Sequence, residues 1–129
     1  MSQTALVTGS NRGIGLELCR QLKERGFDVI ATCRHRSPAL TELDVEIIED
    51  VEVSDPISLK ALSEKLGDRK IDWLINNAGI AAGLGLNDID SNAIDSFKSM
   101  FEVNSLGPLL TTQALVEHMS QGSKVGIIT

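Results

Sequence analysis

The residues best suited to chemistry in this chain form a glycine-rich segment near its start: Thr8-Gly9-Ser10-Asn11-Arg12-Gly13-Ile14-Gly15. An apolar run precedes the segment and an amphipathic pattern follows it, so the chain would turn there from a strand into a helix. Glycine adopts a positive φ without steric cost, and its missing side chain lets a phosphate approach the backbone. The N–H groups and dipole of the helix start then favour an anion. No Lys-Ser/Thr pair follows the last glycine, so the segment differs from a P-loop and predicts a dinucleotide-type phosphate turn.

The end of the second predicted strand indicates which ribose the site would hold. In folds that bind NAD, an acidic residue there accepts a hydrogen bond from the ribose 2′-hydroxyl. Here the strand ends in Arg34-His35-Arg36, with no acid. Arg34 and Arg12 could flank a 2′-phosphate, because a guanidinium offers a planar fork of donors. A hydrogen bond to a charged group is worth ~1.5–3 kcal/mol, which favours NADP over NAD by roughly 10- to 100-fold. The alternatives are solvated loop arginines and NAD as the cofactor.

Asparagines supply further candidates after the fourth predicted strand and within a later helix. Asn76 and Asn77 precede Ala78 and Gly79 at a strand end, where backbone groups lack partners and an amide can both donate and accept. For Asn76 we favour a turn that ties adjacent loops together. Asn104 lies in a helical pattern although asparagine is a poor helix former, so we expect its side chain to make a functional polar contact. The alternative is an exposed helix position with no such role.

The elements that must position these residues alternate between strand and helix. Strands are predicted over the apolar runs 4–8, 28–33, 45–48, 71–75 and 124–129. Between them we predict a helix from Ile14 that Gly26 stops, a short helix or turn at 38–43, and a helix that Ser54 or Asp55 caps and Gly67 ends. A loop over 78–87 precedes a long helix from about Ser91 to Met119. This alternation predicts an α/β fold, a Rossmann-like doubly wound parallel sheet with right-handed crossovers, in one domain over 1–129.

Side-chain spacing predicts which helix faces are buried. The first helix would bury a stripe, and the long helix would bend at Gly107-Pro108 and bury a stripe of its own. The predicted buried residues are Ile14, Leu18, Cys19 and Leu22 in the first helix and Phe97, Phe101, Leu110 and Ala114 in the long one.

Composition excludes several classes of function. Acidic residues outnumber basic ones 18 to 12, which argues against nonspecific nucleic-acid binding. No apolar run is long enough to span a membrane, and the start of the chain does not resemble a secretory signal. The two cysteines and two histidines, at positions 19, 33, 35 and 118, form neither a disulfide framework nor a metal pattern, so no metal site is expected. We therefore expect a reduced, cytoplasmic protein. The chain contains no tyrosine, so it holds no phenolic acid or base.

Together, the glycine segment and the Asn76-Asn77-Ala78-Gly79 motif resemble the short-chain dehydrogenase/reductase family, and Asn104 is similar to an asparagine of its fourth helix. Arg34 resembles the NADP-preferring, carbonyl-reductase-like branch. The resemblance implies hydride transfer between NADP and a small-molecule carbonyl or alcohol, and a strand order of 3-2-1-4-5. It also implies that Asn104 helps to hold an active-site lysine through a water. The cofactor contacts that it implies are Gly9, Asn11, Arg12, Gly13, Ile14, Gly15, Arg34, Asn77, Ala78 and Gly79.

The sequence departs from the family at two places. The family's Asp-Val pair after the third strand, which contacts adenine, corresponds to Glu52-Val53, with Asp50-Val51 as a competing register. The serine and the Tyr-x-x-x-Lys that follow the fifth strand in the family are not in this sequence. We therefore expect the cofactor-binding N-terminal half of a reductase, truncated after strand five and inactive by itself.

The sequence leaves two alternative functions open and also predicts that the chain associates with itself. A non-catalytic nucleotide-binding or signalling module on the same half-fold is the main alternative. A methyltransferase using S-adenosylmethionine is opposed by the glycine spacing and by the missing acid after the second strand. The apolar run Val125–Ile128 would form a sheet edge, which predicts self-association or a homo-oligomer.

Overall fold

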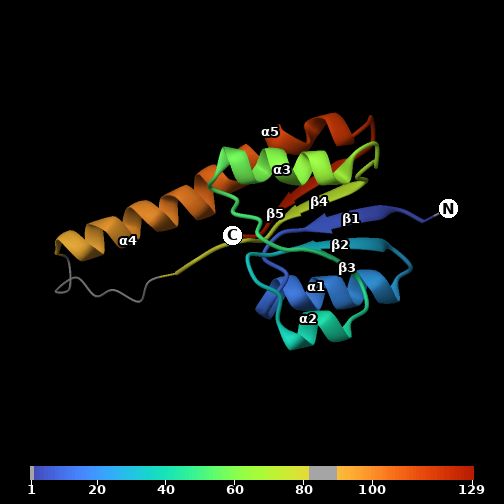
Figure 1. Ribbon diagram of the computed structural model, residues 1–129, viewed down its shortest axis with the longest axis horizontal. Coiled ribbons are helices and arrows are strands. Elements are labelled where there is room, and N and C mark those ends of the chain that lie inside the picture. The colour runs from blue at the N-terminus through green and yellow to red at the C-terminus, as the bar shows by residue number, and fades with distance from the viewer. Residues whose placement is uncertain (1, 82–89) are drawn as a thin grey trace.

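A parallel five-stranded sheet forms the centre of the molecule (Figure 1), in a computed structural model that describes residues 2–81 and 90–129. The strands stand in the order β3-β2-β1-β4-β5, and every neighbouring pair is parallel. This confirms the predicted topology. The strands are β1 (Thr4–Val7), β2 (Asp28–Thr32), β3 (Glu46–Ile48), β4 (Trp73–Asn76) and β5 (Lys124–Ile127).

Helices cover both faces of the sheet, as a doubly wound fold requires. Figure 1 shows α1 and α2 on one face and α3 and α5 on the other. A π-helical turn, η2, joins α4 to α5, and a 3-10 turn, η3, follows α5. The bounds are α1 (Gly13–Glu24), α2 (Pro38–Glu42), α3 (Pro56–Leu66), α4 (Ser91–Phe101), η2 (Glu102–Leu106), α5 (Gly107–Leu115) and η3 (Val116–His118).

The core consists of two apolar layers because successive strand residues point to opposite faces. Leu6 of β1 packs in the layer toward α3, whereas its neighbour Val7 packs in the layer toward α1. Both faces are therefore buried, which is why the strands read as continuous apolar runs rather than alternating ones. The first layer also contains Leu59, Leu62, Leu66 and Leu74, and the second contains Cys19, Ala31, Leu40 and Ile75.

Local capping contacts fix where the helices begin. The Asp55 carboxylate accepts a hydrogen bond from the Ile57 N–H at 3.0 Å, so Asp55 rather than Ser54 caps α3. Pro56 occupies the first turn, where no N–H partner is needed. Gly67, at φ +59°, ends the helix as predicted. Ser37 caps α2 in the same way, by accepting from the Leu40 N–H.

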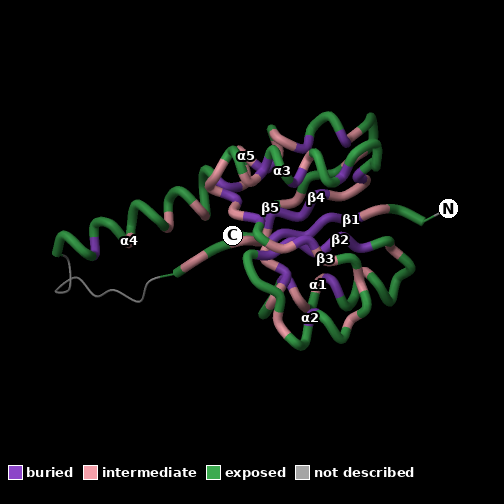
Figure 2. Tube along the Cα trace, in the orientation of Figure 1, coloured by how far each residue is buried: buried purple, intermediate pink, exposed green. Residues whose placement is uncertain are grey.

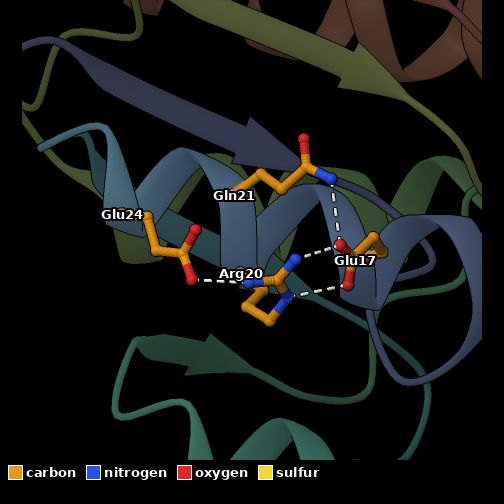
Figure 3. Close-up of polar contacts among 4 residues, drawn as sticks. All are labelled: Glu17, Arg20, Gln21 and Glu24. Carbon is orange, nitrogen blue, oxygen red and sulfur yellow. Dashed lines mark hydrogen bonds and ion pairs between the residues drawn. The ribbon is translucent and has the colours of Figure 1, made fainter.

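Ion pairs and hydrogen bonds line the solvent face of α1 (Figure 3). Arg20 donates to Glu17 one turn before it and to Glu24 one turn after it, and the Gln21 amide also donates to Glu17. These are the i, i+3 and i, i+4 spacings that place side chains side by side on a helix. The Arg20 guanidinium and the Gln21 amide lower the pKa of Glu17 to about 2.

The C-terminal helical segment differs from the prediction. The expected single helix is interrupted at η2, directly before the predicted bend at Gly107. Phe97 and Phe101 were expected to be buried, and this is wrong: their exposed fractions are 42% and 59%. Figure 2 shows the reason, because α4 projects away from the sheet and is mostly exposed. Leu110 and Ala114, farther along the segment, do pack against the core.

Two other expectations are settled by position. Ile14 was assigned to the buried stripe of α1, but it is 61% exposed because it lies in the first turn of the helix and lines an open cavity. Residues 82–87 of the predicted loop lie outside the described residues, and 78–81 form no regular element. None of the helices described is long and apolar enough to cross a membrane.

Candidate functional site

A cavity of about 670 Å³ lies at the carboxyl ends of β1, β2 and β4. The sheet order reverses at β1, whose two neighbours are β2 and β4, and ligands of doubly wound folds bind at such a point. Four segments supply most of the wall: the glycine turn, the end of β2, the loop after β3 and the loop after β4. Their lining residues are Gly9, Asn11, Arg12, Gly13, Ile14, Thr32, Cys33, Arg34, Val51, Glu52, Val53, Ser54, Asn77, Ala78, Gly79 and Ile80.

Two glycines of the turn are required by close contacts. A Cβ on Gly15 would lie 2.1 Å from the Gly9 carbonyl oxygen and 2.5 Å from the Asn77 amide nitrogen. A Cβ on Gly9 would lie 2.7 Å from Ala78 Cα, and Gly9 has a φ of +65°. A larger residue at either place would push the turn away from the end of β4. These two glycines therefore allow the turn and the β4 loop to pack together into one wall.

Thr8 and Asn77 join this wall by hydrogen bonds. The buried Thr8 hydroxyl accepts from the backbone N–H of Asn77 at 3.0 Å and of Ala78 at 2.9 Å. In return, the Asn77 amide donates to the carbonyls of Thr8 at 3.2 Å and Gly9 at 3.1 Å. The sequence placed Asn77 among the cofactor contacts and Thr8 at the start of the glycine segment, but it did not predict that Thr8 would bind the loop after β4.

The first turn of α1 faces the cavity through Gly13 and Ile14. Arg12 occupies the position before the helix but forms no side-chain cap, and the first turn contains no acidic residue. Gly13 has open space where a Cβ would stand. The backbone N–H groups of this turn lack partners within the helix, so they can bind an anion.

Charged residues of both signs line the cavity: Arg12, Arg34, Glu52 and Glu102. Arg34 Nη1 lies 4.0 Å from Glu52 Oε2, and both side chains are partly exposed. Arg36, the other arginine of this strand end, is not a lining residue. It pairs instead with Glu49 at 2.7 Å, and hydrogen bonds from the Arg36 backbone N–H and guanidinium lower the pKa of Glu49.

The loop after β3 distinguishes the two registers proposed for the family's acidic pair. Val51 and Val53 are both buried and both line the cavity, whereas of the two acids only Glu52 lines it. The Ser58 hydroxyl holds this loop, because it donates to the Asp50 carbonyl at 3.0 Å and accepts from the Glu52 N–H at 2.8 Å. The geometry therefore favours the pair Glu52-Val53.

Gly107 has a packing role that its sequence position did not reveal. A Cβ on Gly107 would lie 2.8 Å from Val53 Cγ2. The glycine thus lets the start of α5 approach the loop that lines the cavity, in addition to standing at the predicted bend.

Asn104 clamps the loop that follows β4. Its Oδ1 accepts from the Ile80 N–H at 2.8 Å, and its Nδ2 donates to the Ile80 carbonyl at 2.7 Å. The amide therefore satisfies both backbone groups of one residue, and it lies close to Gly79, where a Cβ would meet Asn104 Oδ1 at 3.2 Å. The water-mediated contact to a lysine stays a prediction.

Asn76 has a different role from its neighbour Asn77. A turn was expected at Asn76, and this is wrong: Asn76 is the last residue of β4, and its buried amide donates to the Thr112 hydroxyl of α5 at 3.3 Å.

The two cysteines are buried in the protein. Burial raises the pKa of Cys19 and of Cys33, although Cys33 also lines the cavity. In the described ranges no three His, Cys, Asp or Glu residues form a group that could hold a metal.

Comparisons with known proteins agree on one family. The family profile described as short chain dehydrogenase matches residues 3–129. The 1-hydroxy-2-glutathionyl-2-methyl-3-butene dehydrogenase of Rhodococcus sp. (strain AD45) is 34% identical over 128 residues, covering 98% of this chain and 55% of that protein. The L-xylulose reductase of Caenorhabditis elegans is 32% identical over 135 residues, covering 95% and 51%. The chain thus spans about half the length of the curated relatives it matches.

Solved structures show the same likeness in three dimensions. A carbonyl reductase from Pseudomonas aeruginosa PAO1 in complex with NADP superposes with a TM-score of 0.84 at 30% identity, covering 97% of this chain and 60% of that one. An NADPH-bound carbonyl reductase from chicken fatty liver gives a TM-score of 0.75 at 32% identity, covering 89% and 50%.

Proposed function

This chain belongs to the short-chain dehydrogenase/reductase family of oxidoreductases, and we propose that it forms the NADP-binding part of an enzyme that transfers hydride to or from a small-molecule carbonyl or alcohol. The observation that carries the proposal is the cavity wall in which the glycine turn, Asn77 and Arg34 meet at the point where the sheet order reverses. Two similar structures with bound NADP or NADPH support the choice of cofactor.

The residues present fit a dinucleotide. Space beside Gly13 and the N–H groups of the first turn of α1 suit the pyrophosphate, and Val51 and Val53 offer an apolar surface for the adenine. Arg12 and Arg34 would hold the 2′-phosphate, and Asn77, Ala78 and Gly79 would lie beside the second ribose. When bound, the nicotinamide supplies the hydride.

The chain's own residues bind and orient in this proposal. Thr8 and Asn77 fix the turn against β4, and Asn104 fixes the loop through Ile80. None of the 129 residues is a tyrosine, so no phenol in this chain can give a proton to the substrate oxygen. We propose that this stretch provides the cofactor site and that its own residues do not complete the proton transfer.

Location and assembly are part of the same proposal. Both cysteines are free and buried, which suits a reducing compartment such as the cytoplasm. The edge strand β5 exposes Val125 and Ile127, so we propose that the chain self-associates.

Titration of the 129-residue chain with NADP⁺ and NAD⁺ by calorimetry tests the proposal. We expect NADP⁺ to bind more tightly, and Arg34→Ala to weaken NADP⁺ by about tenfold or more while it changes NAD⁺ by less than about twofold. Arg36→Ala is the matched control, since Arg36 lies outside the cavity wall, and it should change neither dissociation constant. Equal affinities for the two dinucleotides would contradict the NADP assignment.

A further inference from the structure

We infer that Glu52 is a second determinant of cofactor choice, which opposes Arg34 by holding its guanidinium when no 2′-phosphate is present. The inference rests on the proposed function, because it concerns the same cavity. It assigns to this carboxylate a role in selecting between a phosphorylated and a free ribose.

Glu52 is held in place at both its backbone and its side chain. Its N–H donates to the Ser58 hydroxyl at 2.8 Å, and its carbonyl accepts from the Asp55 N–H at 3.1 Å. The Ser54 hydroxyl donates to Oε1 at 3.2 Å, which leaves Oε2 on the side of Arg34, 4.0 Å from Nη1. The two carboxylate oxygens therefore have different neighbours: Ser54 at Oε1 and the Arg34 guanidinium on the side of Oε2.

The two arginines of the cavity differ in their partners. Within the described chain, Arg12 takes part in no ion pair, whereas Arg34 lies beside Glu52. A 2′-phosphate placed at Arg34 would bring about 1.5 to 2 negative charges next to the Glu52 carboxylate. The phosphate would compete for the guanidinium and would also be repelled by Glu52. An unphosphorylated ribose meets neither cost, because its hydroxyls can donate to a carboxylate.

A neighbouring pair provides the structural contrast. Arg36 and Glu49 make a closer contact, at 2.7 Å, but neither residue lines the cavity. Of the two arginine–glutamate pairs, only Arg34 and Glu52 line the cavity and can contact a ligand bound there.

The experiment uses two small probes that differ in the 2′-phosphate, adenosine 2′,5′-bisphosphate and 5′-AMP. Their dissociation constants are measured by calorimetry on the wild-type chain and on Glu52→Gln. We expect the preference for the bisphosphate to rise about three- to tenfold in Glu52→Gln, since a partly exposed ion pair is weak and the phosphate carries more than one charge. The matched control Glu49→Gln should leave the preference unchanged.

Each outcome has one meaning. If neither probe binds the wild-type chain, the proposed function fails and this inference falls with it. If both bind and Glu52→Gln leaves the preference within about twofold or lowers it, the proposed function stands and Glu52 does not oppose Arg34. Glu52→Ala, with folding checked by circular dichroism, should shift the preference in the same direction as Glu52→Gln; a shift in the opposite direction would also overturn the inference.

Discussion

The glycine turn and the C-terminal segment from α4 to β5 are built in contrasting ways. In the turn, Thr8 is buried and its hydroxyl accepts two backbone hydrogen bonds from the loop after β4. In the C-terminal segment, Phe101 is 59% exposed, and β5 forms an edge with Ile127 55% exposed. In the turn, the side chains of Thr8 and Asn77 are paired by contacts within the chain, while the C-terminal segment presents apolar side chains to solvent.

This difference indicates what each region can do by itself. A preformed wall needs no ordering when a ligand arrives, so its binding free energy is not spent on folding the site. Exposed apolar side chains on a helix and on a sheet edge instead gain stability when something covers them. We therefore expect the glycine turn to bind a nucleotide without rearrangement, and the C-terminal segment to be the region where protein contacts form.

The strongest test of this comparison is catalysis by the 129-residue chain. General acid catalysis contributes at least about 10²-fold, and preorganised donors at the substrate oxygen contribute a further ~10²-fold or more. The chain has no tyrosine to act as the acid, so we expect it to bind NADPH but to reduce carbonyls about 10⁴-fold more slowly than a complete enzyme would. The assay is NADPH oxidation with a panel of aldehydes and ketones.

Purity decides the interpretation of that assay. Turnover of about one per second, which is within the ordinary range for enzymes, in a preparation free of longer protein would show that the chain completes the reaction. Loss of that turnover in Asn104→Ala would show that the reaction depends on the Asn104 amide, which also clamps Ile80.

Matched glycine substitutions compare the stability of the two regions. Gly15→Ala places a Cβ 2.1 Å from the Gly9 carbonyl oxygen, so the turn must shift, and we expect a loss of roughly 1–3 kcal/mol or more together with loss of NADP binding. Gly126→Ala in β5 meets nothing within 4 Å, and its effect should stay within about 0.5 kcal/mol. Urea unfolding measures both, and equal losses would contradict the contrast.

Self-association tests the exposed region directly. Because β5 is an open apolar edge, light scattering should show the wild-type chain forming dimers or larger species as its concentration rises. Ile127→Lys should increase the monomer fraction with little change in stability, since a lysine on an edge strand disfavours strand pairing. Ile57→Lys is the control, because Ile57 is 81% exposed and belongs to α3 rather than to the edge strand β5. A clean wild-type monomer at high concentration would rule out this use of the edge.

The sequence predicted features that follow from local rules and missed those set by distant contacts. The strand positions and the caps at Asp55 and Gly67 follow from apolar runs, carboxylate capping and the freedom of glycine, whereas the strand order was implied by the family resemblance. Thr8 was named in the glycine segment, but its two hydrogen bonds were missed because its partners lie 69 and 70 residues away. Gly107 was read only as a bend, because its contact with Val53 joins two distant segments.

Errors of burial have the same origin. The spacing of Phe97 and Phe101 correctly indicates one helix face, but whether that face is covered depends on what lies beside α4. In the site, the sequence left two registers open after β3, and only the cavity lining distinguished Glu52 from Asp50.

The smallest expected effect concerns the hydrogen bonds among Glu17, Arg20, Gln21 and Glu24 on the exposed face of α1, which we call the surface ladder. Removing it tests whether surface charges or the buried turn keep α1 in place. The Arg20 and Gln21 hydrogen bonds lower the pKa of Glu17 from 4.5 to about 2. The folded pKa is lower than the unfolded one, so the stabilisation is present above about pH 4.5 and is lost as the pH falls toward 2. Glu17→Gln should therefore lower the Tm slightly near neutral pH, and the difference from wild type should shrink below about pH 4.5 and in high salt. Glu64→Gln, an exposed change on α3, is the control for the loss of a single surface charge. Thermal melts followed by circular dichroism measure both variants, and a loss for Glu17→Gln as large as that for Gly15→Ala would mean that the surface ladder, rather than the contacts of Thr8 and Asn77, holds α1 and its turn in place.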